Sequence, residues 1–140
     1  LKGQINHHSC LLMKPLKFMN LSGQPIQEII NFYKIEKEKT FIIHDDLDLE
    51  LGKVKLKFAG GNGGHNGLSN IDEMIGKDYN RIRIGINHPG SKDLVSNYVL
   101  NKFTNDEMSL IETKLDKVTD NFNTLLDDQV LFLTRLAEDN

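Results

Sequence analysis

The chain has 140 residues, of which 39% are hydrophobic and 26% are charged, so it is long enough for one globular domain with a modest core. Its formal net charge of -3 excludes attraction of polyanions by the overall field, and a nucleic acid would have to bind a local basic patch. One cysteine, no signal-peptide pattern and no apolar run of membrane-spanning length exclude a disulfide framework and an integral membrane protein. These features predict a cytoplasmic protein with a single domain over residues 1–140.

The N-terminal part of the chain predicts a strand, a loop and a helix. Residues 10–13 form an apolar run that predicts a buried strand, with Cys10 as a small core residue. Neighbouring histidines keep open the alternative that Cys10 is a nucleophile. Segment 18–23 is predicted to be a loop in which Ser22 is the N-cap of a helix. The apolar face of this helix carries Ile26, Ile29, Ile30 and Tyr33.

Carboxylates follow the next predicted strand. Residues 40–43 form a short apolar run, typical of a strand buried in a parallel sheet, and it ends in His44-Asp45-Asp46-Leu47-Asp48. Asp45 and Asp46 have three candidate roles, as metal ligands, as a nucleophile, or as the partner that orients a histidine. The calcium-loop pattern does not occur, because its glycine and late glutamate are missing at the fixed offsets. Asp46 and Asp48 also fit a polar turn after a buried strand.

The most informative segment is the loop Gly60-Gly61-Asn62-Gly63-Gly64-His65-Asn66-Gly67-Leu68. Alternation over 53–58 predicts a strand before it, and apolar spacing over 68–75 predicts a helix after it. Glycine allows backbone to approach a ligand closely, and amide side chains both donate and accept hydrogen bonds. We therefore interpret the loop as part of a binding site, with a flexible solvated turn as the alternative. No Gly-Lys-Ser/Thr follows, so nucleotide binding is not predicted.

The second half of the chain alternates between strand and helix signals. Residues 81–86 predict a strand closed by a turn at 87–90, and a short element is predicted at 98–100. A capping box at 104–107 predicts a long helix carrying Met108, Ile111, Leu115, Val118 and Phe122. A last helix is predicted around residues 130–136. Strands that alternate with helices predict an α/β fold with three α/β/α layers and a mixed, mostly parallel central sheet.

Basic side chains alternate along two of the predicted strands. Lys53, Lys55 and Lys57 share one strand face, and Arg81 and Arg83 share another. Alternating lysines commonly protect a sheet edge from pairing. Phosphate contact is the competing interpretation, with Arg83 capable of a bidentate grip.

Four ordered motifs closely resemble bacterial-type peptidyl-tRNA hydrolase. They are Phe18-Met19-Asn20-Leu21-Ser22-Gly23, Ile43-His44-Asp45-Asp46-Leu47-Asp48, the loop from Gly60 to Leu68, and Arg81-Ile82-Arg83-Ile84-Gly85-Ile86-Asn87-His88-Pro89-Gly90. The resemblance covers nearly the whole chain and weakens in the C-terminal helices. It implies hydrolysis of the ester that joins a peptide to the 3′-terminal ribose of tRNA, which frees the tRNA for reuse.

The resemblance implies a role for each matching position. Asn20 and Asn66 correspond to amides that bind the 3′ end of the substrate and position water, with Phe18 beside them as an apolar contact. Asp45 corresponds to the carboxylate that orients the catalytic histidine, and His65 would support Asn66.

The resemblance also implies how tRNA is held. Lys55 and Arg83 correspond to basic positions that bind tRNA phosphate. Neither a metal nor an organic cofactor is implied. The complete family domain is implied to be a monomer whose partner is tRNA or peptidyl-tRNA, with no membrane association.

The chain departs from the family pattern in one respect. The family's general base lies in an Arg-His-Asn-type motif that follows a Gly-Asn-Pro-Gly loop, and neither motif occurs in the sequence. The resemblance therefore implies that the chain lacks an N-terminal segment on the order of 40–50 residues long. Two alternatives stay open, a catalytically silent tRNA-binding or RNA-binding module and, less well supported, a metal-dependent phosphotransfer enzyme that uses Asp45 and Asp46.

Overall fold

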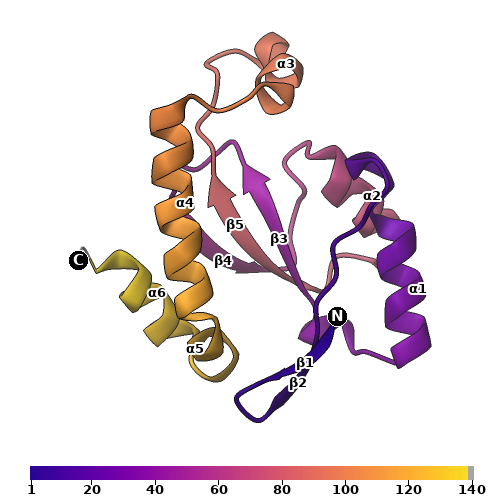
Figure 1. Ribbon diagram of the computed structural model, residues 1–140. Coiled ribbons are helices and arrows are strands. Elements are labelled where there is room, and N and C mark those ends of the chain that lie inside the picture. Colours follow the sequence, from indigo (N-terminus) through magenta and orange to yellow (C-terminus); the bar gives the residue numbers. More distant parts are fainter. Residues whose placement is uncertain (139–140) are drawn as a thin grey trace. The chain divides into compact units, whose positions relative to one another are not determined.

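The computed structural model describes residues 1–138 and confirms the α/β class (Figure 1). The chain divides into two compact units. Unit 1 comprises residues 1–3, 9–43 and 56–82, and unit 2 comprises residues 4–8, 44–55 and the chain from 83 onward. No helix within residues 1–138 is both long enough and apolar enough to cross a membrane.

The N-terminal hairpin and the helices of unit 1 come first in the chain. The elements that start within residues 1–79 are β1 (Lys2–Ile5), β2 (His8–Leu11), η1 (Met19–Leu21), α1 (Gly23–Tyr33), η2 (Lys37–Lys39), β3 (Phe41–Asp46), β4 (Val54–Phe58) and α2 (Asn66–Ile75). Helices α1 and α2 lie side by side (Figure 1). Their apolar faces meet in the core of unit 1, which contains Ile26, Ile30, Leu68, Ile71, Ile75 and Tyr79, with Ile35 and Ile42 packed against it.

The helices of unit 2 follow the last strand. The remaining elements are β5 (Asn80–Gly85), η3 (Lys92–Leu94), α3 (Val95–Leu100), α4 (Asn105–Asp120), α5 (Phe122–Asp127) and α6 (Gln129–Ala137). Helices α4, α5 and α6 contact one another. Their buried side chains are Ile111, Val118, Thr124, Leu125, Phe132 and Leu136. The predicted capping box is confirmed, because the Thr104 and Glu107 side chains each accept the other residue's backbone N–H.

The main sheet has the strand order β3-β5-β4, so β5 is its central strand. Asn80 N donates to the Thr40 carbonyl at 2.9 Å and Ile86 N donates to the Asp46 carbonyl at 3.0 Å. The residue numbers of donor and acceptor rise together along the two strands, so β3 and β5 are parallel. Strand β3 lies at the edge of the described sheet, although its apolar run is typical of a strand buried within a parallel sheet.

Strand β4 pairs antiparallel with β5. Ala59 N donates to the Tyr79 carbonyl at 3.0 Å, and Gly85 N donates to the Lys53 carbonyl at 2.8 Å. Residue numbers rise along one strand as they fall along the other, so this pair is antiparallel. Together with the parallel pair of β3 and β5, it makes the sheet mixed, as predicted. Strand β4 is an edge of the described sheet, and its alternating lysines are exposed, as expected of residues that discourage edge pairing.

Near the N-terminus, the predicted buried strand is wrong and the predicted N-cap is confirmed. Cys10 lies in β2 and is half-buried, and the strand ends at Leu11, so residues 10–13 are not a buried core strand. Strand β2 pairs with β1 in a two-stranded sheet separate from the main sheet. Ser22 is the N-cap of α1, as predicted, but its side chain makes no capping hydrogen bond, because its hydroxyl donates to the Met19 carbonyl at 2.7 Å.

Two boundaries also differ from the predictions. Strand β3 runs through Asp46, so Asp45 and Asp46 lie inside the strand and not in a turn after it. The long C-terminal helix ends at Asp120, and Phe122 begins α5 instead of completing the apolar face of α4. The apolar spacing continued across the break, and a spacing pattern carries no information about a change in helix direction.

Candidate active site

The end of the glycine-rich loop is the N-terminus of α2. His65 is the N-cap, and its Nδ1 accepts a hydrogen bond from Leu68 N at 3.2 Å. Because Nδ1 accepts, the neutral ring carries its proton on Nε2. Asn66 follows as the first residue of the helix and is exposed. His65 thus fixes the first helical turn and with it the position of Asn66.

The turn that carries Asn20 lies against this helix end. Asn20 is the middle residue of η1, and η1 contacts α2. Gly67 makes the approach possible, since a Cβ there would lie 2.9 Å from Met19 Cγ and 3.0 Å from His65 Cε1. Phe18 directly precedes η1 and has 82% of its surface exposed. Unit 1 therefore brings together the elements that carry four predicted site residues: Phe18, Asn20, His65 and Asn66.

The glycine-rich loop is held from beneath by a buried arginine. Arg81 in β5 is 2% exposed, and its guanidinium donates to the carbonyls of Gly60 and Gly61, with the Gly60 bond at 3.0 Å. The same group forms an ion pair with Asp72 of α2 at 3.3 Å. Backbone carbonyls in the loop thereby gain charged donors, which are stronger partners than neutral ones. The loop backbone is therefore held by Arg81 of β5, which is itself paired with Asp72 of α2.

Asp72 connects the loop support to the core of unit 1. Its Oδ1 accepts the Tyr79 hydroxyl at 2.8 Å, and its Oδ2 accepts the Asn62 side-chain amide at 3.4 Å. Burial, followed by the hydrogen bond to Asp72, raises the pKa of Tyr79 far above its usual value, so the hydroxyl stays a donor at all ordinary pH. Arg81 also lies over the Tyr79 ring, with its guanidinium carbon 4.9 Å from the ring centroid.

Unit 2 holds the remaining predicted site residues. Arg83 Nε donates to Asp46 Oδ2 at 2.7 Å, and both side chains are largely buried. Burial raises the pKa of Asp46, but the hydrogen bonds from Arg83 and from the Asp48 backbone, together with the nearby charges, outweigh burial and bring the pKa below its usual value of 3.8. Asp45 precedes Asp46 in β3 and is half-buried. Lys55 lies on β4 and is exposed. Arg83 therefore has an acidic partner within the protein.

Sequence reasoning missed the residues that support the loop. Alternation along the strand groups Arg81 with Arg83 as a candidate phosphate contact, but the Arg81 guanidinium is buried beneath the loop and is not available to a ligand. Asp72 had no assigned role. The available signal was the position of Arg81 in a short strand next to Ile82, two residues after the aromatic Tyr79, where a charge is buried only if it is paired.

The glycine loop, the amide side chains and the mixed sheet together define an α/β protein with a candidate ligand site at a strand-to-helix turn. Residues 1–138 match the family model described as peptidyl-tRNA hydrolase. A peptidyl-tRNA hydrolase of Rickettsia bellii is 49% identical over 125 residues, which are 89% of this chain and 68% of the relative. One of Rickettsia prowazekii is 44% identical over 130 residues, which are 93% and 70%.

Solved structures give the same result. The crystal structure of peptidyl-tRNA hydrolase from Acinetobacter baumannii superimposes with a TM-score of 0.88 at 40% sequence identity, over 96% of this chain and 69% of that chain. The agreement covers sequence and fold over nearly all of the chain. The chain belongs to the peptidyl-tRNA hydrolase family.

Proposed function

We propose that the chain hydrolyses the ester bond of peptidyl-tRNA, giving a free peptide carboxylate and a tRNA with its 3′-terminal ribose hydroxyl restored. Water adds its oxygen to the ester carbonyl carbon, the bond from that carbon to the ribose oxygen breaks, and the ribose oxygen takes up a proton. Family membership over residues 1–138 is the observation that carries this proposal. We expect the reaction to take place in the cytoplasm, with tRNA as the partner and no metal or organic cofactor.

The amides of unit 1 fit the substrate end of this reaction. Asn20 and Asn66 are both exposed, and their elements are in contact. We propose that these two side chains form hydrogen bonds to the ester carbonyl, the terminal ribose and the attacking water, because an amide supplies both donors and an acceptor. The positive end of the α2 dipole lies at Asn66. It stabilises the negative charge that develops on the ester carbonyl oxygen during attack by water. Phe18 supplies an exposed aromatic surface beside η1 for apolar contact with the substrate.

Two further groups complete the assignment. Asp45 is proposed to orient the histidine that acts as base, by holding one imidazole tautomer and stabilising its protonated form. No Arg-His-Asn-type motif occurs in the 140 residues. Lys55 and Arg83 are proposed to bind tRNA phosphate. Lys55 is exposed, whereas Arg83 must share its guanidinium between Asp46 and the phosphate.

A second candidate function is tRNA binding without cleavage. The observation that favours it is the presence of exposed amide and basic side chains, which are suited to binding whether or not cleavage follows. Metal-dependent phosphotransfer through Asp45 and Asp46 is less well supported, because Arg83 already neutralises Asp46. A divalent cation would have to displace that guanidinium.

The test is release of the blocked amino acid from N-acetyl-aminoacyl-tRNA by the 140-residue chain in the presence of a chelator. Free aminoacyl-tRNA is the control substrate, and binding of the same tRNA is measured in parallel. Selective cleavage of the blocked substrate supports the hydrolase assignment. Binding without cleavage supports the second function, and absence of both in a folded sample contradicts the two proposals together.

The amide assignment is tested with Asn20→Asp and Asn66→Asp, which keep size but remove the amide donors. We expect each to lower cleavage by roughly 10²–10³-fold, the usual effect of removing one donor to a developing oxyanion. Asn31→Asp on the exposed face of α1 is the matched control and should retain the original rate. Equal losses in all three variants would contradict the assignment.

A further inference from the structure

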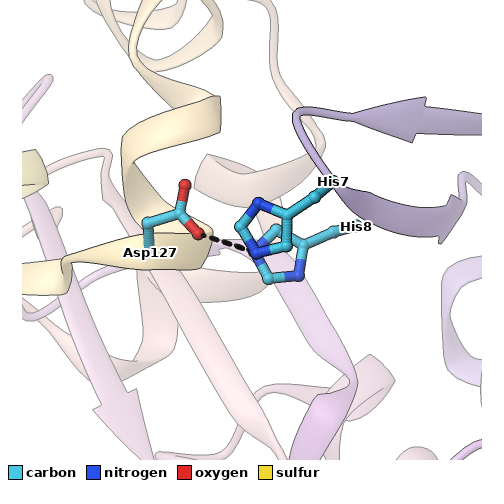
Figure 2. A group of neighbouring side chains, drawn as sticks. All are labelled: His7, His8 and Asp127. Carbon is cyan, nitrogen blue, oxygen red and sulfur yellow. Dashed lines mark hydrogen bonds and ion pairs between the residues drawn. The ribbon is translucent and has the colours of Figure 1, made fainter.

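Two histidines and one aspartate form a cluster in unit 2 that contains none of the residues assigned above. His7 lies in the turn between β1 and β2, His8 begins β2, and Asp127 is the last residue of α5. Figure 2 shows both imidazoles directed at the Asp127 carboxylate. His8 Nε2 lies 2.7 Å from Asp127 Oδ1, and His7 Nε2 lies 3.7 Å from the same oxygen.

The hairpin turn places the two imidazoles on the same side of the chain. Consecutive residues of a regular strand point to opposite faces, so neighbouring histidines within a strand could not share a ligand. His7 belongs to the turn and escapes this alternation, and the two ring centroids lie 4.0 Å apart. Both rings are therefore able to offer Nε2 to one acceptor.

The carboxylate is oriented by a fourth residue. Asn6 donates from its side-chain amide to Asp127 Oδ2 at 3.0 Å, which leaves Oδ1 facing the histidines. A partner that holds the second carboxylate oxygen is the usual outer-shell arrangement around a metal-binding carboxylate.

We propose that His7, His8 and Asp127 form a binding site for a divalent first-row transition-metal ion. One ligand atom from each residue lies within 4.8 Å of the other two. Tetrahedral Zn²⁺ with bonds of about 2.0–2.2 Å separates its ligand atoms by about 3.4 Å. The observed 2.7 Å and 3.7 Å lie on either side of that separation. A shift of less than about 1 Å at each histidine would admit the ion.

The donor set determines which ion is expected. Two imidazole nitrogens and one carboxylate oxygen suit Zn²⁺, Ni²⁺ or Cu²⁺, whereas Mg²⁺ and Ca²⁺ require mostly oxygen ligands. Three protein ligands leave at least one coordination position of the ion open. Water can reach that position, since the side chains of His7 and Asp127 are 75% and 40% exposed. The bound ion would connect the β1–β2 turn to the end of α5 and stabilise both. This site is independent of the proposed hydrolysis.

The experiment titrates Zn²⁺ into the chelator-treated, tag-free chain by calorimetry, with Mg²⁺ as the comparison ion. We expect one Zn²⁺ per chain and no saturable binding of Mg²⁺. His7→Gln, His8→Gln and Asp127→Asn should each weaken Zn²⁺ binding by at least about 10-fold, a loss that even outer-shell changes cause at metal sites. His88→Gln, at an exposed turn residue, is the matched control and should leave the affinity unchanged.

A second readout does not depend on any variant. In the unaltered chain, Zn²⁺ should shift or broaden the histidine ring NMR signals of His7 and His8 and leave those of His88 in place. Absence of saturable Zn²⁺ binding overturns the proposal. So does binding that survives all three substitutions, or ring signals of His7 and His8 that do not respond to Zn²⁺.

Discussion

Arg81 is the buried cation on which the glycine-rich loop depends. Arg81→Met keeps most of the side-chain volume but leaves Asp72 without its ion-pair partner and two loop carbonyls without charged donors. We expect a loss on the order of 3–5 kcal/mol in the free energy of unfolding, the usual effect of breaking a buried pair. Urea unfolding measures it. Arg135→Met removes one hydrogen bond at an exposed residue and should cost only about 1 kcal/mol. Similar losses in the two variants would show that the loop support is unimportant.

His65 has a structural role that can be separated from any chemical one. His65→Ala removes the acceptor for Leu68 N and should lower stability by about 1 kcal/mol. His65→Asn keeps an N-cap acceptor and should restore most of that stability. If His65 acts only by fixing Asn66, the asparagine variant also restores substrate cleavage. A stable asparagine variant with the low activity of the alanine variant would mean that the imidazole contributes to binding or catalysis directly.

Asp46 makes the free energy of unfolding depend on pH in the acid range. Because its pKa is lower in the folded chain than the usual 3.8, ionised Asp46 stabilises the fold above that value, and this contribution is lost as pH falls through the folded pKa. Asp46→Asn removes the carboxylate. We expect its stability deficit, measured by urea unfolding, to be constant near neutral pH and to shrink below about pH 3.8. Asp116→Asn in α4 is the control, and a deficit that grows toward acid would contradict the assignment.

Predictions at the residue scale succeeded where one residue carries its own signal. The glycines around His65 and Asn66 marked the loop, and Thr104 and Glu107 marked a helix start that is confirmed. Arg81 was misassigned because alternation predicts which residues share a face but not which face is covered. His7, His8 and Asp127 were not grouped together, because Asp127 is more than a hundred positions along the chain and no local pattern joins them.

At the scale of elements, the approach of η1 to α2 depends on the missing side chain at Gly67. Gly67→Ala would place a Cβ within 3.1 Å of the Met19 carbonyl oxygen and closer still to Met19 Cγ. We expect a loss of about 1–3 kcal/mol in stability, typical of overpacking, and weaker substrate binding because Asn20 is displaced. Gly61→Ala is the control, since nothing lies within 4 Å of its added Cβ. Unfolding and tRNA binding measured on both variants test the argument, and equal behaviour would refute it.

The types of the elements were predictable from the spacing of apolar residues and from turn and capping residues, whereas the partners against which the elements pack were not. Strands β4 and β5 and helices α1, α2 and α4 were predicted close to where they lie, because each has a clear apolar period. The break between α4 and α5 and the separation of β2 from the main sheet were missed. Both depend on contacts with distant residues, which a period in the local sequence does not encode.

At the scale of the whole molecule, a net charge of -3 means that tRNA binding must depend on a few local cations. We therefore expect a shallow dependence of log affinity on log salt concentration, with Lys55→Gln reducing the magnitude of the slope by roughly one unit if Lys55 contacts one phosphate. Lys39→Gln is the matched control, because Lys39 is exposed but forms an ion pair with Glu36 at 3.1 Å. Filter binding across a KCl series measures both slopes. Identical slopes in the two variants would remove Lys55 from the phosphate-binding surface and leave Arg83 as the remaining assigned contact.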